Sequence, residues 1–561
     1  MARSGSRPLP DIAQAYADAV NLYRQGRLDE AEKIGARILK SLPDSHDALV
    51  LIGLVKLGRG RAGAALALID AALKVNPRSP DALSNRGLAL AALNRDAEAL
   101  ASLDQALAAA PDNPDTLNNR GNVLVKLGRP ADALAAFDRA VGLAPQHFGA
   151  RINRGNALAA LGRFAEALAQ YDALLSAHPA NAELHFNRGN ALSSLARHAD
   201  AIAAYDRAIS IRPGHLKAHL NRGVALQALN RHDEAIASFE DVLAIDKSNA
   251  DARHNAGLSR LTIGDYRRGF EHYESRWQRS GMPARRRALG RPLWLGEYPL
   301  HRKTILLHAE QGLGDTIQFA RYAPLLARMG AKVVLEVPAE LAALLGRVAG
   351  LAGIVASGEP LPAFDVHCPM GSLPLALRTE ATAIPAAIPY LEASEDRIAK
   401  WRSRLAALPA PRVAIAWSGR AAHPNDRNRS IALARLAPLF ALEAVSFISV
   451  QRELRGEDAQ ALARLPRIAH LGEELHDFDD TAAVLALADL VISVDTSVAH
   501  LAGAMGRPAW ILLPFAPDWR WMLRREDSPW YPTARLFRQD ALGDWDSVIA
   551  RARGELAGTL N

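Results

Sequence analysis

A fixed repeat period of about 34 residues runs through the first half of the chain and restricts its fold more than any other feature. Glycine and proline both recur at this spacing, and the triplet Asn-Arg-Gly returns five times. A fixed period of this length is typical of stacked helix–turn–helix units, in which glycine allows helices to approach and proline ends a helix. The recurring residues are Gly53, Gly87, Gly121, Gly155, Gly189, Gly223 and Gly257, and Pro43, Pro77, Pro111, Pro145, Pro179 and Pro213.

The repeats resemble tetratricopeptide repeats. Within the unit that begins at Pro114, we expect Ala133 and Ala140 at the helix–helix contact, Phe137 between repeats, and Pro145 after the second helix. Seven units run from about Pro10 to Asn249, and a degenerate eighth runs to about Pro283. The sequence therefore predicts an α-solenoid over residues 1–283, in which the first helices line a concave face.

A line of asparagines occupies one position of the first helix in six successive repeats. An amide offers two donors and one acceptor, so it can pair with both polar groups of an extended peptide backbone. Capping or pairing between neighbouring helices is the alternative interpretation. The arrangement resembles the asparagine ladder of the eukaryotic O-GlcNAc transferases, and this resemblance implies a peptide-binding groove. The candidate peptide-binding residues are Asn85, Asn119, Asn153, Asn187, Asn221 and Asn255.

The arginines of the same triplet have two interpretations. Each can pair with a carboxylate of the repeats, or the set can favour acidic segments of a bound protein. The residues concerned are Arg86, Arg120, Arg154, Arg188 and Arg222.

Residues 284–302 break the period and are basic and rich in proline and glycine, which predicts a linker. Short apolar segments and helical segments then alternate, a pattern typical of parallel sheets covered by helices. We expect strands within residues 303–310, 332–337, 353–357, 364–368, 412–419, 445–451, 490–495 and 509–514. Two sets of four predict two Rossmann-like subdomains, 303–400 on the acceptor side and 401–561 on the nucleotide-sugar side, with ligands in a cleft at the strand ends.

Two segments follow predicted strands. In "EQGLGD", Gly312 and Gly314 predict a tight turn, with a helix beginning at about Thr316 and Asp315 either capping that helix or facing the cleft. In "DTSVAH", the strand ends at Asp495 and a helix opens at Thr496 and Ser497. A helix N-terminus can hold a phosphate, and His500 can add a donor. A capped helix with a buried histidine is the alternative.

Taken together, these two segments resemble the glycosyltransferases of family 9, the heptosyltransferase type, which have the GT-B fold. The resemblance covers about residues 303–540. It implies that Asp315 is the general base of an inverting transfer and that Asp495, Thr496 and His500 bind the donor diphosphate. Ser497 replaces the usual glycine, and the lysine of the family near the donor phosphates has no clear counterpart. The candidate nucleotide-sugar-binding residues are Gly314, Trp417, Asn425, Arg429, Asp495, Thr496, Ser497 and His500.

Composition bounds the remaining classes. The net charge of +7 raises nucleic acid as a partner, but the arginines are scattered and aromatics make up 6%, so a solvated basic surface is favoured. A single cysteine, Cys368, fits a reducing compartment. The N-terminus has no apolar signal segment and no long apolar run occurs, so we expect a cytoplasmic protein without membrane insertion.

Two further motifs have structural interpretations. Asp477-Phe478-Asp479 has the D-x-D spelling of metal-dependent transferases, but it precedes a predicted helix, so we expect a cap and no metal or other cofactor. The aromatic tail with Trp519, Trp521, Trp530 and Tyr531 is predicted to pack rather than to stack on a sugar, although Arg520 can reach the cleft.

The combined interpretation is a protein glycosyltransferase, similar in architecture to O-GlcNAc transferases and to flagellin-modifying enzymes that carry these repeats. The repeats would hold the acceptor polypeptide, and the C-terminal half would transfer a sugar from a nucleotide sugar to its Ser or Thr hydroxyls. Two alternatives are a transferase for lipopolysaccharide or another carbohydrate, and a non-catalytic adaptor with a degenerate transferase domain.

Overall fold

The structure is a computed structural model that describes residues 12–279, 287–423 and 425–559. Its contacts divide the chain into two compact units, Met1–Ala218 and His219–Asn561. The predicted first repeat residue near Pro10, the predicted end of the repeats near Pro283 and the first residues of the predicted linker lie outside the described ranges.

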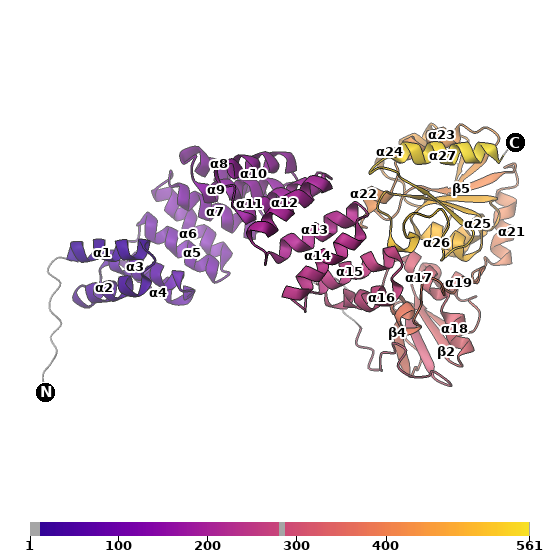
Figure 1. Cartoon of the computed structure of the whole chain (residues 1–561), viewed down its shortest axis with the longest axis horizontal. Coiled ribbons are helices and arrows are strands. Elements are labelled where there is room, and N and C mark those ends of the chain that lie inside the picture. Colours follow the sequence, from indigo (N-terminus) through magenta and orange to yellow (C-terminus); the bar gives the residue numbers. More distant parts are fainter. Residues whose placement is uncertain (1–11, 280–286, 424, 560–561) are drawn as a thin grey trace. The chain divides into compact units, whose positions relative to one another are not determined.

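Paired helices fill the region that the repeat period covers (Figure 1). The eighth pair has a second helix of 8 residues where the other second helices have 14, which agrees with the predicted degenerate repeat. The pairs are α1 Ile12–Arg24 and α2 Leu28–Ser41, α3 His46–Gly58 and α4 Ala62–Val75, α5 Pro80–Ala92 and α6 Asp96–Ala109, α7 Pro114–Lys126 and α8 Pro130–Leu143, α9 Phe148–Ala160 and α10 Phe164–Ala177, α11 Ala182–Ser194 and α12 His198–Ile211, α13 Leu216–Ala228 and α14 His232–Ile245, α15 Ala250–Ile263 and α16 Tyr266–Tyr273. A 3-10 turn, η1 Glu274–Gln278, follows α16.

The glycine of each triplet is required by a bulky side chain on the second helix of its own repeat. A Cβ atom built at Gly155 in α9 would lie 2.7 Å from Cε1 of the buried Tyr171 in α10, far inside an ordinary contact. The same relation places Gly87, Gly121, Gly189 and Gly223 against Leu103, Phe137, Tyr205 and Phe239. The bulky residue therefore packs directly on the backbone of the preceding helix, and glycine recurs because no other residue leaves room for it.

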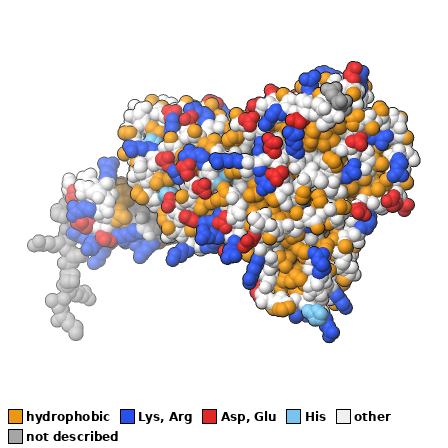
Figure 2. All heavy atoms as spheres, turned by 45° about the vertical axis from the view of Figure 1, so that its right-hand side comes forward, with side chains coloured by type: hydrophobic (Ala, Val, Ile, Leu, Met, Phe, Trp, Pro, Cys, Tyr) orange, Lys and Arg blue, Asp and Glu red, His pale blue; other side chains and the backbone are white. Residues whose placement is uncertain are grey.

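The arginine of the triplet pairs with an aspartate on the second helix of the preceding repeat. In four repeats an Arg Nε lies 2.6–2.7 Å from an Asp Oδ1, which confirms pairing with repeat carboxylates. These pairs are Arg86–Asp70, Arg120–Asp104, Arg154–Asp138 and Arg188–Asp172. Basic and acidic side chains are accordingly intermixed over the face of the repeats seen in Figure 2. Paired charges of this kind leave little excess positive field to attract acidic segments.

Two parallel sheets follow the repeats, and their strands confirm the eight predicted segments. The first sheet has the order β3-β2-β1-β4 and the second has the order β10-β9-β8-β5-β6-β7. The strands are β1 Thr304–His308, β2 Lys332–Val337, β3 Leu351–Ala356, β4 Val366–Pro369, β5 Arg412–Ala416, β6 Ser446–Ser449, β7 Ile468–His470, β8 Leu490–Val494, β9 Ala509–Leu513 and β10 Ala534–Arg538. The sequence patterns missed β7 and β10, which are the two edge strands of the second sheet.

Helices cover both sheets, as parallel β–α alternation requires. They are α17 Leu313–Ala320, α18 Ala323–Arg328, α19 Ala339–Leu345, α20 Leu373–Ala376, α21 Glu395–Arg404, α22 Asp426–Arg429, α23 Ala437–Phe440, α24 Gly456–Ala463, α25 Phe478–Ala486, α26 Ser497–Ala504 and α27 Trp545–Gly558, with the 3-10 turns η2 Met370–Ser372, η3 Leu433–Leu436 and η4 Trp519–Trp521. Among the described residues, no helix is long and apolar enough to cross a membrane.

The described part of the predicted linker is packed against the first sheet. Trp294 is buried in the core, and its backbone N–H donates to the carbonyl of His367 in β4 at 2.9 Å. The guanidinium of Arg287 pairs with the buried Glu336 of β2 at 2.7 Å. The described residues of the predicted linker are therefore ordered against the sheet, because burial of one large apolar side chain, Trp294, fixes them there.

A buried ion cluster joins the end of the repeats to the first sheet. Arg276 in η1 donates from Nη2 to Glu310 Oε1 at 3.1 Å and also pairs with Glu274. The backbone N–H of Gly371, just after β4, donates to the same Glu310 oxygen at 3.1 Å. Burial raises the pKa of Glu310 to about 7, with a further rise from the negative charge of Asp315, while Arg276 opposes it.

The packing of triplet glycines predicts the effect of adding one methyl group. Gly155→Ala should destabilise the fold by about 1–3 kcal/mol, because the Cβ atom overlaps the Tyr171 ring. Gly142→Ala in α8 is the matched control, since a Cβ there meets nothing within 4 Å and alanine favours helix by up to about 1 kcal/mol. Thermal unfolding of the two variants should move in opposite directions from wild type. Equal melting temperatures would contradict the packing account.

The raised pKa of Glu310 predicts a pH-dependent stability. Between about pH 4.5 and pH 7, Glu310 is protonated in the folded chain but ionised in the unfolded chain. The contribution of Glu310 to the free energy of unfolding is therefore complete below about pH 4.5 and is lost as the pH rises to about 7. The loss corresponds to roughly 3 kcal/mol. Glu310→Gln removes it, so wild type should melt progressively earlier than the variant over this interval.

The control for this pH series is Glu340→Gln, at an exposed position in the first turn of α19. Scanning fluorimetry of wild type and both variants at several pH values measures the differences in melting temperature. A difference between wild type and Glu310→Gln that does not change with pH would contradict the account.

Candidate functional site

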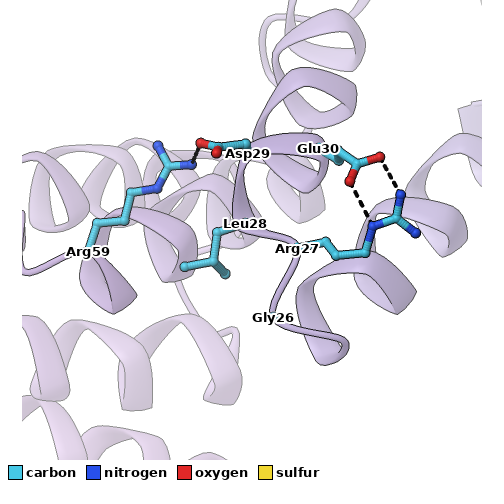
Figure 3. Close-up of a pocket in the computed structure, with 6 residues that line it drawn as sticks. All are labelled: Gly26, Arg27, Leu28, Asp29, Glu30 and Arg59. Atoms are coloured by element: carbon cyan, nitrogen blue, oxygen red, sulfur yellow. Dashed lines mark hydrogen bonds and ion pairs between the residues drawn. The ribbon is translucent and has the colours of Figure 1, made fainter.

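A polar hollow lies near the first repeat of the solenoid, away from the predicted site residues. It has a volume of about 340 Å³ and is lined by Gly26, Arg27, Leu28, Asp29, Glu30 and Arg59 (Figure 3). Arg27 pairs with Glu30 and Arg59 pairs with Asp29, so its charges neutralise one another. None of the predicted site residues lines it.

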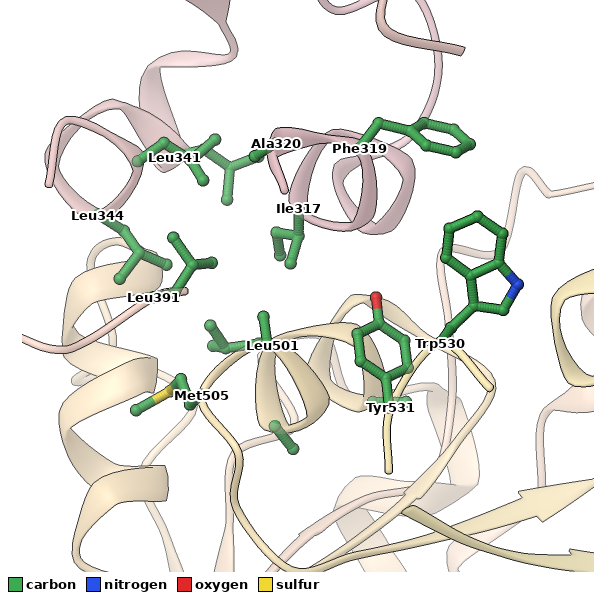
Figure 4. Packing of buried hydrophobic residues seen from close by; sticks show 14 of the residues in the cluster. Ile317, Phe319, Ala320, Leu341, Leu344, Leu391, Leu501, Met505, Trp530 and Tyr531 are labelled. Atoms are coloured by element: carbon green, nitrogen blue, oxygen red, sulfur yellow. The ribbon is translucent and has the colours of Figure 1, made fainter. Parts of the chain in front are cut away.

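The two predicted motifs come together in the second unit. Helix α17, which follows β1, packs on helix α26, which follows β8, through apolar residues such as Ile317 and Leu501 (Figure 4). A Cβ atom at Gly314 would lie 2.6 Å from Cδ2 of His500, so the first turn of α17 rests directly on that imidazole. The C-terminal ends of one strand from each sheet therefore meet at a single place.

The helix after β1 begins earlier than predicted. We expected it to start at about Thr316, but α17 begins at Leu313, so Gly314 and Asp315 belong to its first turn. Gly314 is needed for close packing against His500 rather than for a tight turn. A glycine in a helix N-terminus is easily mistaken for a turn residue, because its packing partner is distant in the sequence.

Asp315 has both carboxylate oxygens engaged. Oδ2 accepts the backbone N–H of the N-cap residue Gly312 at 3.0 Å, so Asp315 does cap the helix, but from its first turn rather than from the turn before it. Oδ1 forms an ion pair with Arg520. The side chain is still 24% exposed, so the same carboxylate caps the helix and reaches the surface of the site. The two interpretations of this residue therefore do not exclude one another.

Asp495 and His500 are buried where the second sheet meets α26. Burial raises the pKa of Asp495 to about 6, and the negative charge of Asp518 adds to the rise. Burial lowers the pKa of His500, so its imidazole is neutral; Nδ1 lies 2.9 Å from the Tyr531 hydroxyl and Nε2 lies 4.0 Å from Asp495 Oδ1. Thr496 is buried and bonded to Ser493, whereas Ser497, the first residue of α26, is half-buried.

The segment after β5 brings Arg429 to this place. Its Nη1 donates to the backbone carbonyl of Asp495 at 2.9 Å, and its buried Nε has no hydrogen-bond partner among the described residues. Asn425 immediately precedes the short helix α22 and accepts from Asn428 at 2.7 Å. Trp417 is fully buried, with its indole N–H donated to Asp458 at 3.0 Å, so its ring would have to leave the core to touch a ligand.

The capping and packing interpretations of two other motifs are confirmed. Asp477 caps α25 by accepting the backbone N–H of Asp480 at 2.9 Å, and Asp479 pairs with Arg347. The aromatic tail is buried: Trp519, Trp521, Trp530 and Tyr531 are each at most 3% exposed. No cluster of three or more His, Cys, Asp and Glu side chains suited to a metal occurs in the described parts of the chain.

The six predicted asparagines all lie on first helices of their pairs and are all half-buried. They occupy α5, α7, α9, α11, α13 and α15. Two of them bond to an amide of the preceding repeat, Asn153 Nδ2 to Asn118 Oδ1 at 2.9 Å and Asn187 Nδ2 to Asn156 Oδ1 at 3.2 Å. Pairing between helices, the alternative to peptide binding, is therefore present in these two repeats.

Two charged residues of the site escaped the sequence patterns. The sequence places Arg520 only within reach of the cleft, whereas in the structure its side chain is 7% exposed and pairs with Asp315. Glu310, the first letter of "EQGLGD", is 8% exposed and bound to Arg276. Glu310 could have been noticed because it stands at the end of a predicted strand. Its partner Arg276 could not, because that residue lies in the region predicted as repeats.

Comparisons with known proteins agree with both halves. Residues 50–114, 118–182, 152–215 and 186–252 match the tetratricopeptide repeat family. Residues 446–512 match glycosyltransferase family 9 (heptosyltransferase), a range that includes Asp495, Thr496, Ser497 and His500 but not Asp315. The match supports a glycosyltransferase.

Individual relatives are similar over part of the chain. Protein FlbA of Caulobacter vibrioides is 29% identical over 324 residues, which are 52% of either protein, so the chain spans about half the length of this curated relative. A tetratricopeptide repeat protein from Parabacteroides merdae is 18% identical, with a TM-score of 0.36 over 44% of this chain and 98% of its own. YrrB, a tetratricopeptide repeat protein with an unusual peptide-binding site, is 28% identical, with a TM-score of 0.29 over 33% of this chain and 95% of its own.

The chain thus consists of a solenoid of tetratricopeptide repeats followed by a parallel α/β region that is consistent with a glycosyltransferase fold.

Proposed function

We propose that the protein transfers a sugar from a nucleotide sugar to Ser or Thr hydroxyls of a polypeptide bound by the repeats, with inversion at the anomeric carbon and without a metal. The observation that carries the proposal is the contact between the first turn of α17 and His500 of α26. It brings together a partly exposed carboxylate from one sheet and a helix N-terminus from the other, at the strand ends where parallel α/β proteins bind ligands.

Asp315 is the proposed base. Its carboxylate would accept the proton of the acceptor hydroxyl, whose oxygen forms a bond to the anomeric carbon as the bond from that carbon to the diphosphate oxygen breaks. The electron pair leaves with the nucleoside diphosphate. Because attack and departure occur on opposite faces, the configuration inverts. A positioned base of this kind contributes about 10²–10⁴-fold to a rate.

The N-terminus of α26 is the proposed diphosphate site. Backbone N–H groups around the half-buried Ser497 and the positive end of the helix dipole favour an anion there. Arg429, held on the Asp495 carbonyl with its Nε unpaired by any described residue, supplies the cation. His500 is neutral, so it contributes a hydrogen bond and a packing surface rather than a positive charge.

The repeats are the proposed acceptor site. The half-buried asparagines of successive first helices offer amides to an extended backbone. The side-chain amides of Asn153 and Asn187 each donate a hydrogen bond to an asparagine of the preceding repeat. These bonds fix the orientation of each side chain, so its Oδ1 is held in one direction as an acceptor for a bound peptide. Recognition of the backbone rather than of side chains suits an enzyme with several acceptor sequences.

The role of Asp315 predicts a separation of binding from turnover. Asp315→Asn keeps the cap on Gly312 but removes the basicity, so turnover should fall roughly 10²–10⁴-fold with donor binding retained. A panel of UDP-, CMP-, ADP- and GDP-sugars identifies the donor, since a ligand at about 100 times its Kd stabilises the fold by about 2.7 kcal/mol. Turnover of this donor is then measured for wild type and variant.

Asp544→Asn is the matched control, because Asp544 also caps a helix, here as the N-cap residue of α27 that accepts the backbone N–H of Ser547. It should leave turnover unchanged. Near-normal turnover of Asp315→Asn would refute the assignment of the base, and a stabilising effect of no sugar nucleotide would favour the non-catalytic adaptor.

The asparagine ladder predicts a collective effect. One amide is worth about 0.5–1.5 kcal/mol net, so a single Asn→Ala change should matter little. Replacing Asn85, Asn119, Asn153 and Asn187 together should weaken binding of a polypeptide acceptor by several kcal/mol, if the contacts roughly add. Donor hydrolysis without an acceptor should be unaffected. Acceptor binding and hydrolysis are measured separately.

The matched control removes four exposed arginines from the same four repeats. Arg95, Arg129, Arg163 and Arg197 precede the second helices and pair locally at i,i+3. Their replacement by alanine should leave acceptor binding intact. Full transfer activity of the asparagine variant would favour a carbohydrate acceptor, and a large fall in its melting temperature would show that the ladder holds helices together.

A further inference from the structure

Arg520 is a buried cation with three protein acceptors. It forms ion pairs with Asp315 and, at 2.8 Å, with Asp518, and its Nε donates to Gln318 of α17. Its guanidinium carbon lies 4.4 Å from the centre of the Trp519 ring. A guanidinium surrounded in this way is fixed in its fork geometry and has little contact with solvent.

The segment that presents Arg520, residues 514–531, is anchored on the last repeats. Asn230, just after α13, donates to the carbonyl of Phe515 at 2.6 Å. The indole N–H of Trp530 donates to the Tyr266 hydroxyl at 2.9 Å, and the Trp519 ring meets Phe270 of α16 edge-on at 5.6 Å. These contacts lie within the second unit, so the repeats help to hold the guanidinium in place.

The same segment is fixed from the other side by a second arginine. Arg538 of β10 donates to the backbone carbonyls of Met522 at 2.9 Å and Arg525 at 2.8 Å. Met522 has a φ of 52°, a left-handed conformation that a residue other than glycine adopts only when its surroundings impose it. The position of Arg520 is therefore determined on both sides.

At Asp315 the contribution of Arg520 is directional. The Gly312 N–H holds one carboxylate oxygen and Arg520 holds the other, so the plane of the carboxylate is set by two partners, one at each oxygen. Without Arg520, a single hydrogen bond would remain, and the side chain could rotate about it. A misplacement of about 1 Å at a reacting group can cost about 10²-fold in rate.

We propose that Arg520 is a positioning residue that acts through Asp315, an inference that rests on the proposed function of that carboxylate. Arg520 itself is assigned no contact with the donor, since three of its five N–H groups donate to protein acceptors and the side chain is only 7% exposed. The charge of Asp315 is also felt by Glu310, Tyr273 and His423, while Asp518 pairs with Arg520.

A double-mutant cycle tests the proposal. Arg520→Gln in the wild-type background should lower kcat for the best sugar nucleotide of the panel by about 10–100-fold, with the donor KM within about 3-fold of wild type. In the Asp315→Asn background the same change should cost less than about 3-fold, because the group through which it acts is already lost. Arg520→Lys, which keeps the charge but not the fork, should restore part of kcat.

Arg404→Gln is the control, since Arg404 forms an exposed pair with Glu474 in the same unit. Two results would overturn the proposal. In the first, Arg520→Gln lowers kcat by the same factor with and without Asp315→Asn; in the second, it raises the donor KM about 10-fold and leaves kcat unchanged. Either result would mean that Arg520 acts on the donor rather than through Asp315. Should Arg520→Gln fail to fold, the same cycle with Arg520→Lys decides between these outcomes.

A crystal structure of the Arg520→Gln variant provides a readout that does not need turnover. The proposal expects Asp315 to leave its present orientation while keeping the bond from Gly312. An Asp315 side chain that stays in place would overturn the proposal even if the wild-type protein transferred no sugar. Absence of turnover in wild type, by contrast, would count against the proposed function alone.

Discussion

The site depends on the close contact between α17 and α26. These helices start at the ends of strands in different sheets, and they approach because Gly314 presents no side chain to His500. Apolar residues such as Ile317, Leu391 and Leu501 bury the remainder of the contact. A side chain at position 314 would separate the helices, and the carboxylate of Asp315 would then move away from the N-terminus of α26. One missing Cβ atom thus sets the distance between the two proposed chemical functions.

The repeats use the same device at regular intervals. The triplet glycine accepts a bulky side chain on its backbone, and the adjacent arginine pairs with an aspartate of the preceding repeat. The glycine contact fixes the packing of the two helices within a repeat, and the ion pair joins the repeat to the preceding one, each at a fixed sequence separation. At the end of the repeats no further helix pair follows. There Arg276 forms a buried ion cluster with Glu274 and with Glu310, which follows the first strand. The last repeats consequently belong to the second compact unit, together with the two sheets.

The site places charged groups in the protein interior, which costs free energy of desolvation. Arg520, Asp495 and His500 are all nearly inaccessible to solvent, and burial pushes the pKa of Asp495 up and that of His500 down. Removing charged groups from water is costly, and a buried ion pair recovers that cost only with good geometry and further hydrogen bonds. The engaged donors of Arg520 meet this requirement. Such a network fixes one arrangement of these side chains, as the proposed inverting transfer would require.

The sequence by itself determined the repeats, eight of the ten strands and the two motif segments, because each is encoded by residues close together in the chain. A fixed repeat period and the alternation of apolar runs with helices need no knowledge of distant contacts. The tertiary structure alone decided the start of α17, the edge strands β7 and β10, the burial of Trp417 and the partners of Asp315 and Glu310. β7 has only three residues, and Arg535 and Arg538 interrupt the apolar residues of β10, so the apolar pattern of both strands is weak. Arg520 and Asp315 stand 205 positions apart. No local pattern records such a pairing, because it arises only when the folded backbone brings the two ends of the site together.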